Sequence, residues 1–281
     1  MIAICPNPFR DSELKYTRQA AEMLHAAGYE TAVCPVFAED APQMIPEDIK
    51  ATTLDAVRSR CSLVVVIGGD GTILSAARQL HSADIPILGV NLGSKGFMAA
   101  LEPEHMRLIV KAAAGEYTVS RRMMLDIELE RGGEIIYRDK ALNDVVLHGY
   151  GDCIRLTAWC AGDRITSFSG DGIILSTPTG STGYSMSAGG PIVEPEASAI
   201  IVSPICAHMM SARSYVLSAS HDVSVLAEKL HGRRAYISVD GNSVMDLTNG
   251  DLLRVRRSER CILMADMGLK SFFDLAFEKL T

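Results

Sequence analysis

The stretch "LVVVIGGDGTIL", from Leu63 to Leu74, joins a run of β-branched residues to a glycine turn and then to a helical apolar pattern. A continuous apolar run of this length is typical of a strand covered on both faces of a parallel sheet. A glycine turn between a strand and a helix presents free N–H groups and the positive end of the helix dipole, so it favours anions. Asp70 lies in the middle of this turn and places a carboxylate where a phosphate would normally bind.

The first hundred residues alternate strand and helix patterns. The pattern predicts strands at residues 1–5, 29–35, 61–67 and 86–90, helices at 11–28, 47–59 and 72–80, and a proline-rich loop across 35–46. Strands separated by helices indicate a parallel sheet with crossover connections. Residues 1–100 are therefore expected to form an N-terminal open parallel-sheet α/β domain.

A helix predicted at residues 102–115 is followed by long stretches in which apolar and polar residues alternate. Two hairpin signals appear, around Gly132-Gly133 and around Gly162-Asp163, and further strands are predicted at 236–241, 243–251, 252–258 and 261–266. Strands that follow one another without helices are typical of an antiparallel β-sandwich, which we expect over residues 101–265. The last residues, 271–280, form an amphipathic pattern, and we expect segment 266–281 to pack back on the first domain.

Composition excludes several classes of protein. The chain has 281 residues and a net charge of −7, and it has no long basic run, so a nucleic-acid partner is not expected. No apolar run approaches the roughly 20 residues that span a bilayer, so no membrane partner is expected either. The seven cysteines are scattered and form no C-x-x-C pair, which indicates reduced thiols in a cytoplasmic protein.

The aspartate of the glycine turn has two interpretations. The turn is neither a Walker A loop nor a dinucleotide fingerprint, because the lysine of the first and the third glycine of the second are missing. Asp70 or Thr72 could simply cap the following helix. Alternatively, the Asp70 carboxylate accepts a proton from an attacking hydroxyl or holds Mg²⁺ on a polyphosphate, and both uses belong to phosphoryl transfer.

Three other segments favour the functional interpretation. Residues 169–190, "SGDGIILSTPTGSTGYSMSAGG", concentrate hydroxyls and open N–H groups around a polar ligand, although a solvated loop is the alternative. Asn143-Asp144, predicted to end a strand, suits ribose hydroxyls or an ordinary turn. "NLGSKGFM", residues 91–98, follows a strand at the edge where open α/β sheets gather ligands. Lys95 within it either contacts phosphate or is solvated.

These segments, together with "SPICAHMMSARS" (203–214) and "VDGN" (239–242), resemble the NAD kinase family in content and order. The resemblance covers most of residues 63–242. It implies ATP-dependent phosphorylation of the 2′-hydroxyl on the adenosine ribose of NAD to give NADP, with Mg²⁺ or another divalent cation. It also implies a homo-oligomer, either a dimer or a tetramer.

The resemblance also implies roles for individual residues. Asp70 is the proton acceptor, and Gly68, Gly69, Gly71 and Thr72 meet the triphosphate. The NAD pocket is implied at Asn143, Asp144, Asp171, Thr179, Thr182, Gly183, Tyr184, Ser185, Met186, Ser187 and Asn242. The chain departs from the family pattern at Asp144, where glutamate is usual, at Gly183, where alanine is frequent, at Asn242, where many members have glutamine, and at Lys95.

Two rival functions remain open at this point. A lipid kinase of the diacylglycerol or sphingosine type shares the glycine turn, and a non-catalytic NAD(P)-sensing module would use Asp70 only as a cap. His148 and His208 are interpreted as structural, since neither is beside a nucleophile in the sequence. No His, Cys or Glu cluster has metal-ligand spacing, so the sequence predicts no dedicated protein metal site.

Overall fold

The computed structural model describes residues 1–36, 44–80, 84–93, 96–209 and 212–280. The chain divides into two compact units, and each is described by itself. The first comprises residues 1–122 and 262–281, and the second comprises residues 123–261. The chain passes from one unit to the other within two long strands, β5 (Thr118–Arg131) and β16 (Leu252–Asp266).

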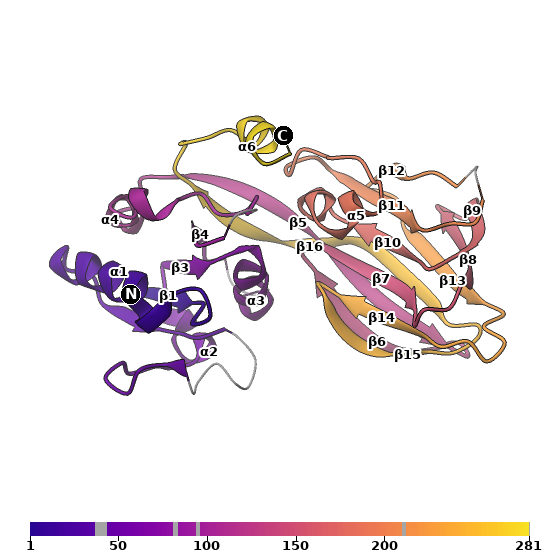
Figure 1. Ribbon diagram of the computed structural model, residues 1–281, viewed down its shortest axis with the longest axis horizontal. Helices are drawn as coiled ribbons and strands as arrows, with labels where there is room; N and C mark the ends of the chain where they lie inside the picture. Colours follow the sequence, from indigo (N-terminus) through magenta and orange to yellow (C-terminus); the bar gives the residue numbers. More distant parts are fainter. Residues whose placement is uncertain (37–43, 81–83, 94–95, 210–211, 281) are drawn as a thin grey trace. The chain divides into compact units, whose positions relative to one another are not determined.

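The first unit is built around a parallel sheet with strand order β2-β1-β3-β4, and Met264 of β16 pairs with Ile87 of β4. Its strands are β1 (Ile2–Pro6), β2 (Thr31–Val33), β3 (Leu63–Gly68) and β4 (Ile87–Asn91), and its helices are η1 (Ser12–Leu14), α1 (Lys15–Ala26), α2 (Leu54–Val57), η3 (Arg58–Arg60), α3 (Asp70–Leu80), η4 (Pro103–His105), α4 (Leu108–Ala113) and α6 (Phe272–Leu280) (Figure 1). All six residues of β3 are buried, because helices cover both faces of the sheet. The predicted open parallel sheet is confirmed.

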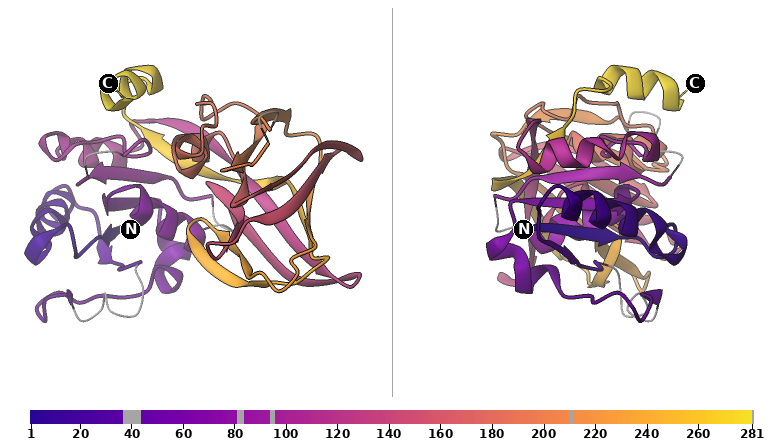
Figure 2. Two further views of the ribbon diagram at one scale, coloured as in Figure 1. Left: turned by 45° about the vertical axis from the view of Figure 1, so that its right-hand side comes forward. Right: turned by 90° about the vertical axis from the view of Figure 1, so that its left-hand side faces the viewer.

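The second unit contains two antiparallel sheets. One has the order β12-β11-β10-β7-β14-β15, and in the other β6 pairs with β5, β5 with β16, and the order continues β16-β13-β8-β9. Figure 2 shows the strands of this unit from two further directions. The remaining bounds are β6 (Glu134–Ala141), β7 (Asp144–Gly149), β8 (Ile154–Cys160), β9 (Asp163–Gly170), β10 (Gly172–Ser176), η5 (Thr179–Thr182), α5 (Tyr184–Ser187), β11 (Ala199–Ile205), β12 (Tyr215–Ser218), β13 (Val223–Glu228), β14 (Ala235–Val239) and β15 (Asn242–Leu247).

One hydrophobic core lies between these two sheets. It takes Leu147 and Ile173 from the first sheet and Leu156, Phe168 and Val223 from the second, all fully buried. Alternate residues of each strand point inward, as expected for two packed antiparallel sheets. The predicted antiparallel β-sandwich is confirmed.

Several predicted boundaries are wrong. Asn143-Asp144 does not end a strand: β6 ends at Ala141 and Asp144 begins β7, because the chain turns at Leu142 and Asn143. The helix expected at 47–59 is limited to α2 and η3, since Thr53 Oγ1 accepts the Ala56 N–H and caps a helix that starts only at Leu54. Helix α3 begins at Asp70 and not at Thr72.

Other differences concern strands. The sequence did not predict β11, β12 or β13, which complete the two sheets of the sandwich. The second hairpin turns at Ala161 and Gly162, both with positive φ, so that Asp163 already belongs to β9. A one-residue shift of this kind is set by the turn conformation, which places two residues in the left-handed region.

The C-terminal helix α6 belongs to the first unit, and Lys279 donates a hydrogen bond to the Gly96 carbonyl. None of its residues is buried, and Phe273 and Phe277 are 66% and 73% exposed. Packing of its apolar face on the first domain therefore stays a prediction.

The Asp251 carboxylate links β5 to the turn that precedes β16. Its fully buried carboxylate accepts hydrogen bonds from Arg131 Nε at 2.9 Å and Nη2 at 2.8 Å, and from the N–H and hydroxyl of Thr248 at 2.8 and 2.9 Å. Burial alone would raise the pKa of Asp251, but these bonds outweigh it and hold the pKa below the ordinary value. The charged form is therefore the one that stabilises the fold.

We expect Asp251→Asn to lower the free energy of unfolding by about 2–4 kcal/mol, because it breaks a buried charged hydrogen-bond network. Since the folded-state pKa is lowered, the wild-type stabilisation is present above the pKa of an unfolded aspartate and is lost as pH falls through the folded value. Urea unfolding followed by the fluorescence of Trp159, in β8 of the same unit, measures both effects.

Arg138→Gln is the matched control, because it breaks the exposed ion pair with Glu128 in the same sheet. Its expected loss is below about 1 kcal/mol. Equal losses for the two variants would contradict the importance assigned to Asp251.

Candidate functional site

The glycine turn after β3 is packed too tightly for a side chain at its first position. A Cβ atom at Gly68 would lie 2.3 Å from Thr72 Oγ1 and 2.9 Å from Asn7 Cβ. Thr72 is buried, and its hydroxyl accepts hydrogen bonds from Asn7 Nδ2 at 3.2 Å and from the Gly69 N–H at 3.3 Å. These contacts hold the turn on the side of Thr72 and Asn7. A Cβ at Gly71 would meet no atom within 4 Å, so the space beside Gly71 is open.

The Asp70 carboxylate accepts hydrogen bonds from the backbone N–H groups of Phe97 at 2.8 Å and Met98 at 3.2 Å. It therefore holds the segment after β4 against the glycine turn. Burial raises the pKa of Asp70 above its ordinary value. The two N–H groups act in the opposite direction, as do the positive charges of Lys279 and Arg122. A carboxylate with a raised pKa is a better proton acceptor than an ordinary aspartate.

Two cations near this turn were missed by the sequence reasoning. Arg10 Nη1 donates to the Leu92 carbonyl at 3.5 Å, and a Cβ atom at Gly93 would lie 2.6 Å from the same nitrogen. A Cβ at Gly69 would lie 3.9 Å from Arg10 Cζ, so the guanidinium lies close to both Gly69 and Gly93. Arg10 follows β1, and only the pairing of β1 with β3 in the folded chain brings it to the edge where β3 ends. Lys279 gave no signal, because it is remote in sequence.

The segment after β4 is fixed by Asn91, the last residue of that strand. Its Nδ2 donates to the Glu102 carboxylate at 3.1 and 3.3 Å, and its Oδ1 accepts the Gly93 N–H at 3.0 Å. Asn91 is buried and therefore shapes the loop from within. Lys95, which the sequence offered as a phosphate contact or a solvated residue, lies outside the described residues.

In the second unit, the turn after β10 packs against the start of β7. Thr177 Oγ1 donates to the Leu142 carbonyl at 2.6 Å, and the Thr177 N–H donates to the Asn143 carbonyl at 2.8 Å. A Cβ atom at Gly180 would lie 2.2 Å from that Asn143 carbonyl oxygen, so only glycine permits the approach. The structure thus brings the Asn143-Asp144 segment and the hydroxyl-rich segment together.

Polar atoms without protein partners gather at this contact. Among the described residues, buried side-chain atoms with no hydrogen-bond partner include Asn143 Oδ1, Ser176 Oγ and Thr179 Oγ1. Asp144 lies opposite Ser176 in the pairing of β7 with β10. Burial, and then the nearby charge of Asp240, raise the pKa of Asp144 to about 7. Buried polar atoms are nearly always paired, so this group is suited to a ligand that carries several hydroxyls.

Tyr184, the first residue of α5, is 41% exposed. Its hydroxyl lies 3.1 Å from His148 Nε2, and His148 Nδ1 lies 2.6 Å from the Gly149 carbonyl. Since a carbonyl only accepts, Nδ1 carries the proton, and in the neutral ring Nε2 accepts the tyrosine O–H. The His148 ring also lies 5.7 Å from that of Tyr236. His148 therefore orients Tyr184, whose exposed ring offers a stacking surface.

The other predicted site residues of this unit lie on the segment from Thr182 to Ser187, at Asp171 and at Asn242. Ser185 is fully buried and hydrogen-bonds Ser203, and Thr182 Oγ1 donates to the Thr179 carbonyl. Gly183, Met186 and Ser187 continue the same segment through α5. Asp171 acts electrostatically on Tyr184 and raises its pKa, after burial and two other groups. Asn242 is exposed and donates only a long bond, 3.4 Å, to the Asp240 carbonyl.

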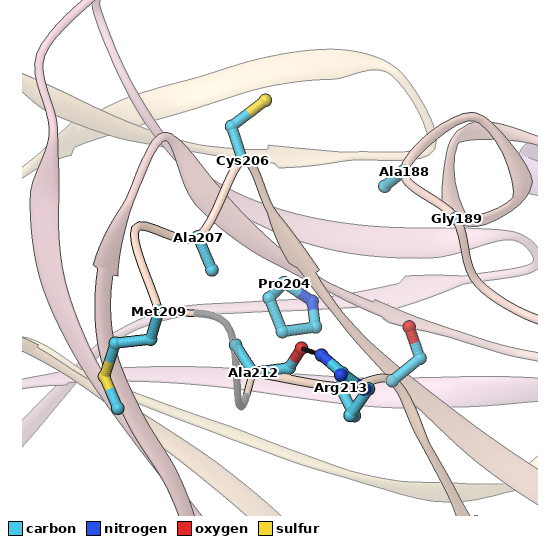
Figure 3. Close-up of a pocket in the computed structure, with 9 residues that line it drawn as sticks. Ala188, Gly189, Pro204, Cys206, Ala207, Met209, Ala212 and Arg213 are labelled. Carbon is cyan, nitrogen blue, oxygen red and sulfur yellow. Dashed lines mark hydrogen bonds between the residues drawn. The ribbon is translucent and has the colours of Figure 1, made fainter.

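A cavity of about 350 Å³ lies beside this segment, lined by Ala188, Gly189, Pro204, Cys206, Ala207, Met209, Ala212, Arg213 and Ser214 (Figure 3). The Cys206 sulfur points away from Pro204, and the Arg213 guanidinium donates to the Ala212 carbonyl at 2.9 Å. Asp171 raises the pKa of the Cys206 thiol, so this cysteine stays protonated near neutral pH.

The described residues include neither a ready-made metal site nor a membrane-spanning helix. Within them, no group of three or more His, Cys, Asp or Glu side chains could hold a metal ion. None of the helices in the same ranges is both long enough and apolar enough to cross a bilayer.

Comparison with known proteins identifies the family to which this chain belongs. The model of the ATP-NAD kinase N-terminal domain matches residues 2–117, and that of the ATP-NAD kinase C-terminal domain matches residues 120–266. The NAD kinase of Acetivibrio thermocellus is 36% identical over 98% of this chain and 94% of its own length. The NAD kinase of Geobacter metallireducens is 39% identical over 81% of each chain.

Solved structures agree with these matches. The crystal structure of yeast NADH kinase complexed with NADH has a TM-score of 0.86 and 26% identity, over 99% of this chain and 86% of that chain. An NAD kinase from Archaeoglobus fulgidus in complex with ATP has a TM-score of 0.76 and 25% identity, over 100% of this chain and 98% of that chain. With both family models matched across nearly its whole length, the chain belongs to the ATP-NAD kinase family.

Proposed function

We propose that this protein transfers the γ-phosphoryl group of ATP to the 2′-hydroxyl on the adenosine ribose of NAD, giving NADP and ADP. The observation that carries the proposal is the convergence of the Asn143-Asp144 segment with the hydroxyl-rich segment around Gly180. The unpartnered polar atoms at this contact suit a ribose, and the exposed Tyr184 ring suits a purine. A lipid acceptor, the enzymatic rival, would require an apolar funnel there.

The glycine turn of the first unit would bind the triphosphate. Helix α3 begins at Asp70, so the first N–H groups of this helix have no partner within it and favour an anion. The Arg10 guanidinium stands by the same turn and would neutralise phosphate charge. Asp70 would accept the proton of the 2′-hydroxyl as that oxygen attacks the γ-phosphorus and ADP leaves.

Magnesium fits the donor set at this turn. The ion keeps several waters and binds through one or two carboxylates together with substrate phosphates, and Asp70 is the carboxylate that the turn offers. When bound, it would neutralise charge on the phosphate oxygens. The roles of the remaining residues, a homo-oligomeric assembly of two or four chains, and a cytoplasmic location also belong to this proposal.

The activity assay uses the purified chain with ATP, MgCl₂ and NAD, and detects NADP with an NADP-specific dehydrogenase. We expect NADP to accumulate in proportion to enzyme. Parallel reactions with sphingosine or diacylglycerol as acceptor test the lipid alternative. Phosphorylated lipid without NADP would overturn the proposal, and NAD binding without turnover would favour the sensing module.

For Asp70→Asn we expect kcat to fall by roughly 10²- to 10⁴-fold with little change in NAD binding, because the proton acceptor is lost. Wild-type kcat should also fall as pH drops through a pKa above that of an ordinary aspartate, since only the ionised carboxyl accepts a proton. Steady-state kinetics across pH and equilibrium dialysis of NAD provide the two measurements.

The hydrogen bonds of Asp70 to Phe97 and Met98 offer a competing explanation, in which the carboxylate only anchors the loop. Under that explanation the variant would lose thermal stability and ATP affinity together, and kcat would fall only modestly. A melting curve and KM for ATP decide between the two roles.

A second substitution tests the triphosphate side. We expect Arg10→Ala to raise KM for ATP about tenfold or more while KM for NAD stays nearly constant, since a charged hydrogen bond to phosphate is lost. Arg60→Ala is the control, because Arg60 forms an exposed ion pair with Glu30 in the same unit. An effect of Arg10→Ala no larger than that of the control would remove Arg10 from the site.

A further inference from the structure

Asp240 lies in a tight turn that faces the beginning of β7. Asp240 and Gly241 both have positive φ, +47° and +80°, and they form the two-residue connection between β14 and β15. Such connections favour Asp-Gly, because both central residues must enter the left-handed region. The conformation directs this part of the chain toward the segment Leu142–Asp144.

The Asp240 carboxylate accepts three consecutive backbone N–H groups from that segment. Oδ2 accepts the Leu142 N–H at 2.9 Å, and Oδ1 accepts the N–H groups of Asn143 at 2.7 Å and Asp144 at 3.1 Å. In return, the Asp240 N–H donates to the Asp144 carbonyl at 3.0 Å. Four hydrogen bonds therefore fix the chain where it turns from β6 into β7.

We propose that Asp240 is a positioning residue for dinucleotide binding, which holds Asn143 and Asp144 in place through their backbone and sets the charge of the Asp144 carboxyl. The inference rests on the proposed function, in which those two side chains receive the ribose. Asn143 Oδ1 has no protein partner and is buried, so its position depends on the backbone that carries it. Asp240 reaches that backbone, and it need not touch the substrate.

The second part of the role is electrostatic. Asp144 is buried, and the negative charge of Asp240, from the β14–β15 turn, disfavours its ionised form. Tyr184, from α5, is also coupled to Asp144, and its raised pKa keeps it neutral near pH 7. A protonated Asp144 can donate one hydrogen bond and accept others, which matches hydroxyls that do both.

The test compares Asp240→Asn with Asp246→Asn in the full-length enzyme. Asp246 lies in β15 of the same sheet and accepts a hydrogen bond from the Tyr150 hydroxyl, so it controls for loss of a nearby charge. Asparagine is close in size to aspartate, but its amide cannot accept the N–H groups on both sides. The measurements are the dissociation constant of NAD, KM for ATP, the melting temperature and the pH dependence of NAD binding.

For Asp240→Asn we expect NAD to bind at least tenfold more weakly, with KM for ATP within twofold of wild type. The midpoint of the pH dependence of NAD binding, expected near 7 in the wild type, should move to lower pH because Asp144 no longer faces a second negative charge. Asp246→Asn should leave both the affinity and the midpoint unchanged.

Two results would overturn the inference. If Asp240→Asn melts at a lower temperature but binds NAD with unchanged affinity and midpoint, Asp240 is only a structural residue. If Asp246→Asn produces the same change, the effect comes from the loss of any nearby negative charge and not from Asp240 in particular. Failure of the proposed function itself is distinguishable, because wild-type protein would then form no NADP from ATP and NAD, whether or not it binds NAD.

Discussion

The loops that carry the candidate functional residues are held by carboxylates that accept backbone N–H groups. Asp70 holds the Phe97-Met98 segment in this way, and Asp240 holds the chain from Leu142 to Asp144. A loop of irregular backbone can be ordered only if its N–H groups find acceptors, and an ionised oxygen is a stronger acceptor than a neutral one. The positions of both sets of functional residues therefore depend on the negative charge of partly buried carboxylates.

Burial of a carboxylate disfavours its charged form and raises its pKa, which favours proton exchange. Burial raises the pKa values of Asp70 and Asp144, and in Asp144 the neighbouring carboxylate of Asp240 adds to the shift. Asp251 shows the contrasting case, since a bidentate arginine keeps its pKa low and leaves it a purely structural anion. The groups next to each carboxylate thus decide whether it can exchange protons near neutral pH or stays charged.

Close backbone approaches are the second constraint. At Gly68 and Gly180, a single added Cβ atom would meet another group at 2.3 and 2.2 Å. At Gly180 that group is the carbonyl of Asn143, so the hydroxyl-rich segment can reach the start of β7 only without a side chain at this position. The glycines of the sequence motifs therefore act as packing residues as well as turn formers.

The sequence by itself determined the fold class, the parallel sheet followed by the sandwich, and the motif residues from Asp70 to Tyr184, because period-two patterns, buried runs and glycine turns are local properties of the chain. It also carried the family resemblance, which the domain matches confirm. Only the tertiary structure decided that Asp144 begins a strand, that Arg10 stands by the glycine turn and that Asp240 organises Asn143. Those facts depend on contacts between residues about 30 to 100 positions apart, and such contacts are set by sheet register and turn conformation, which no local pattern records.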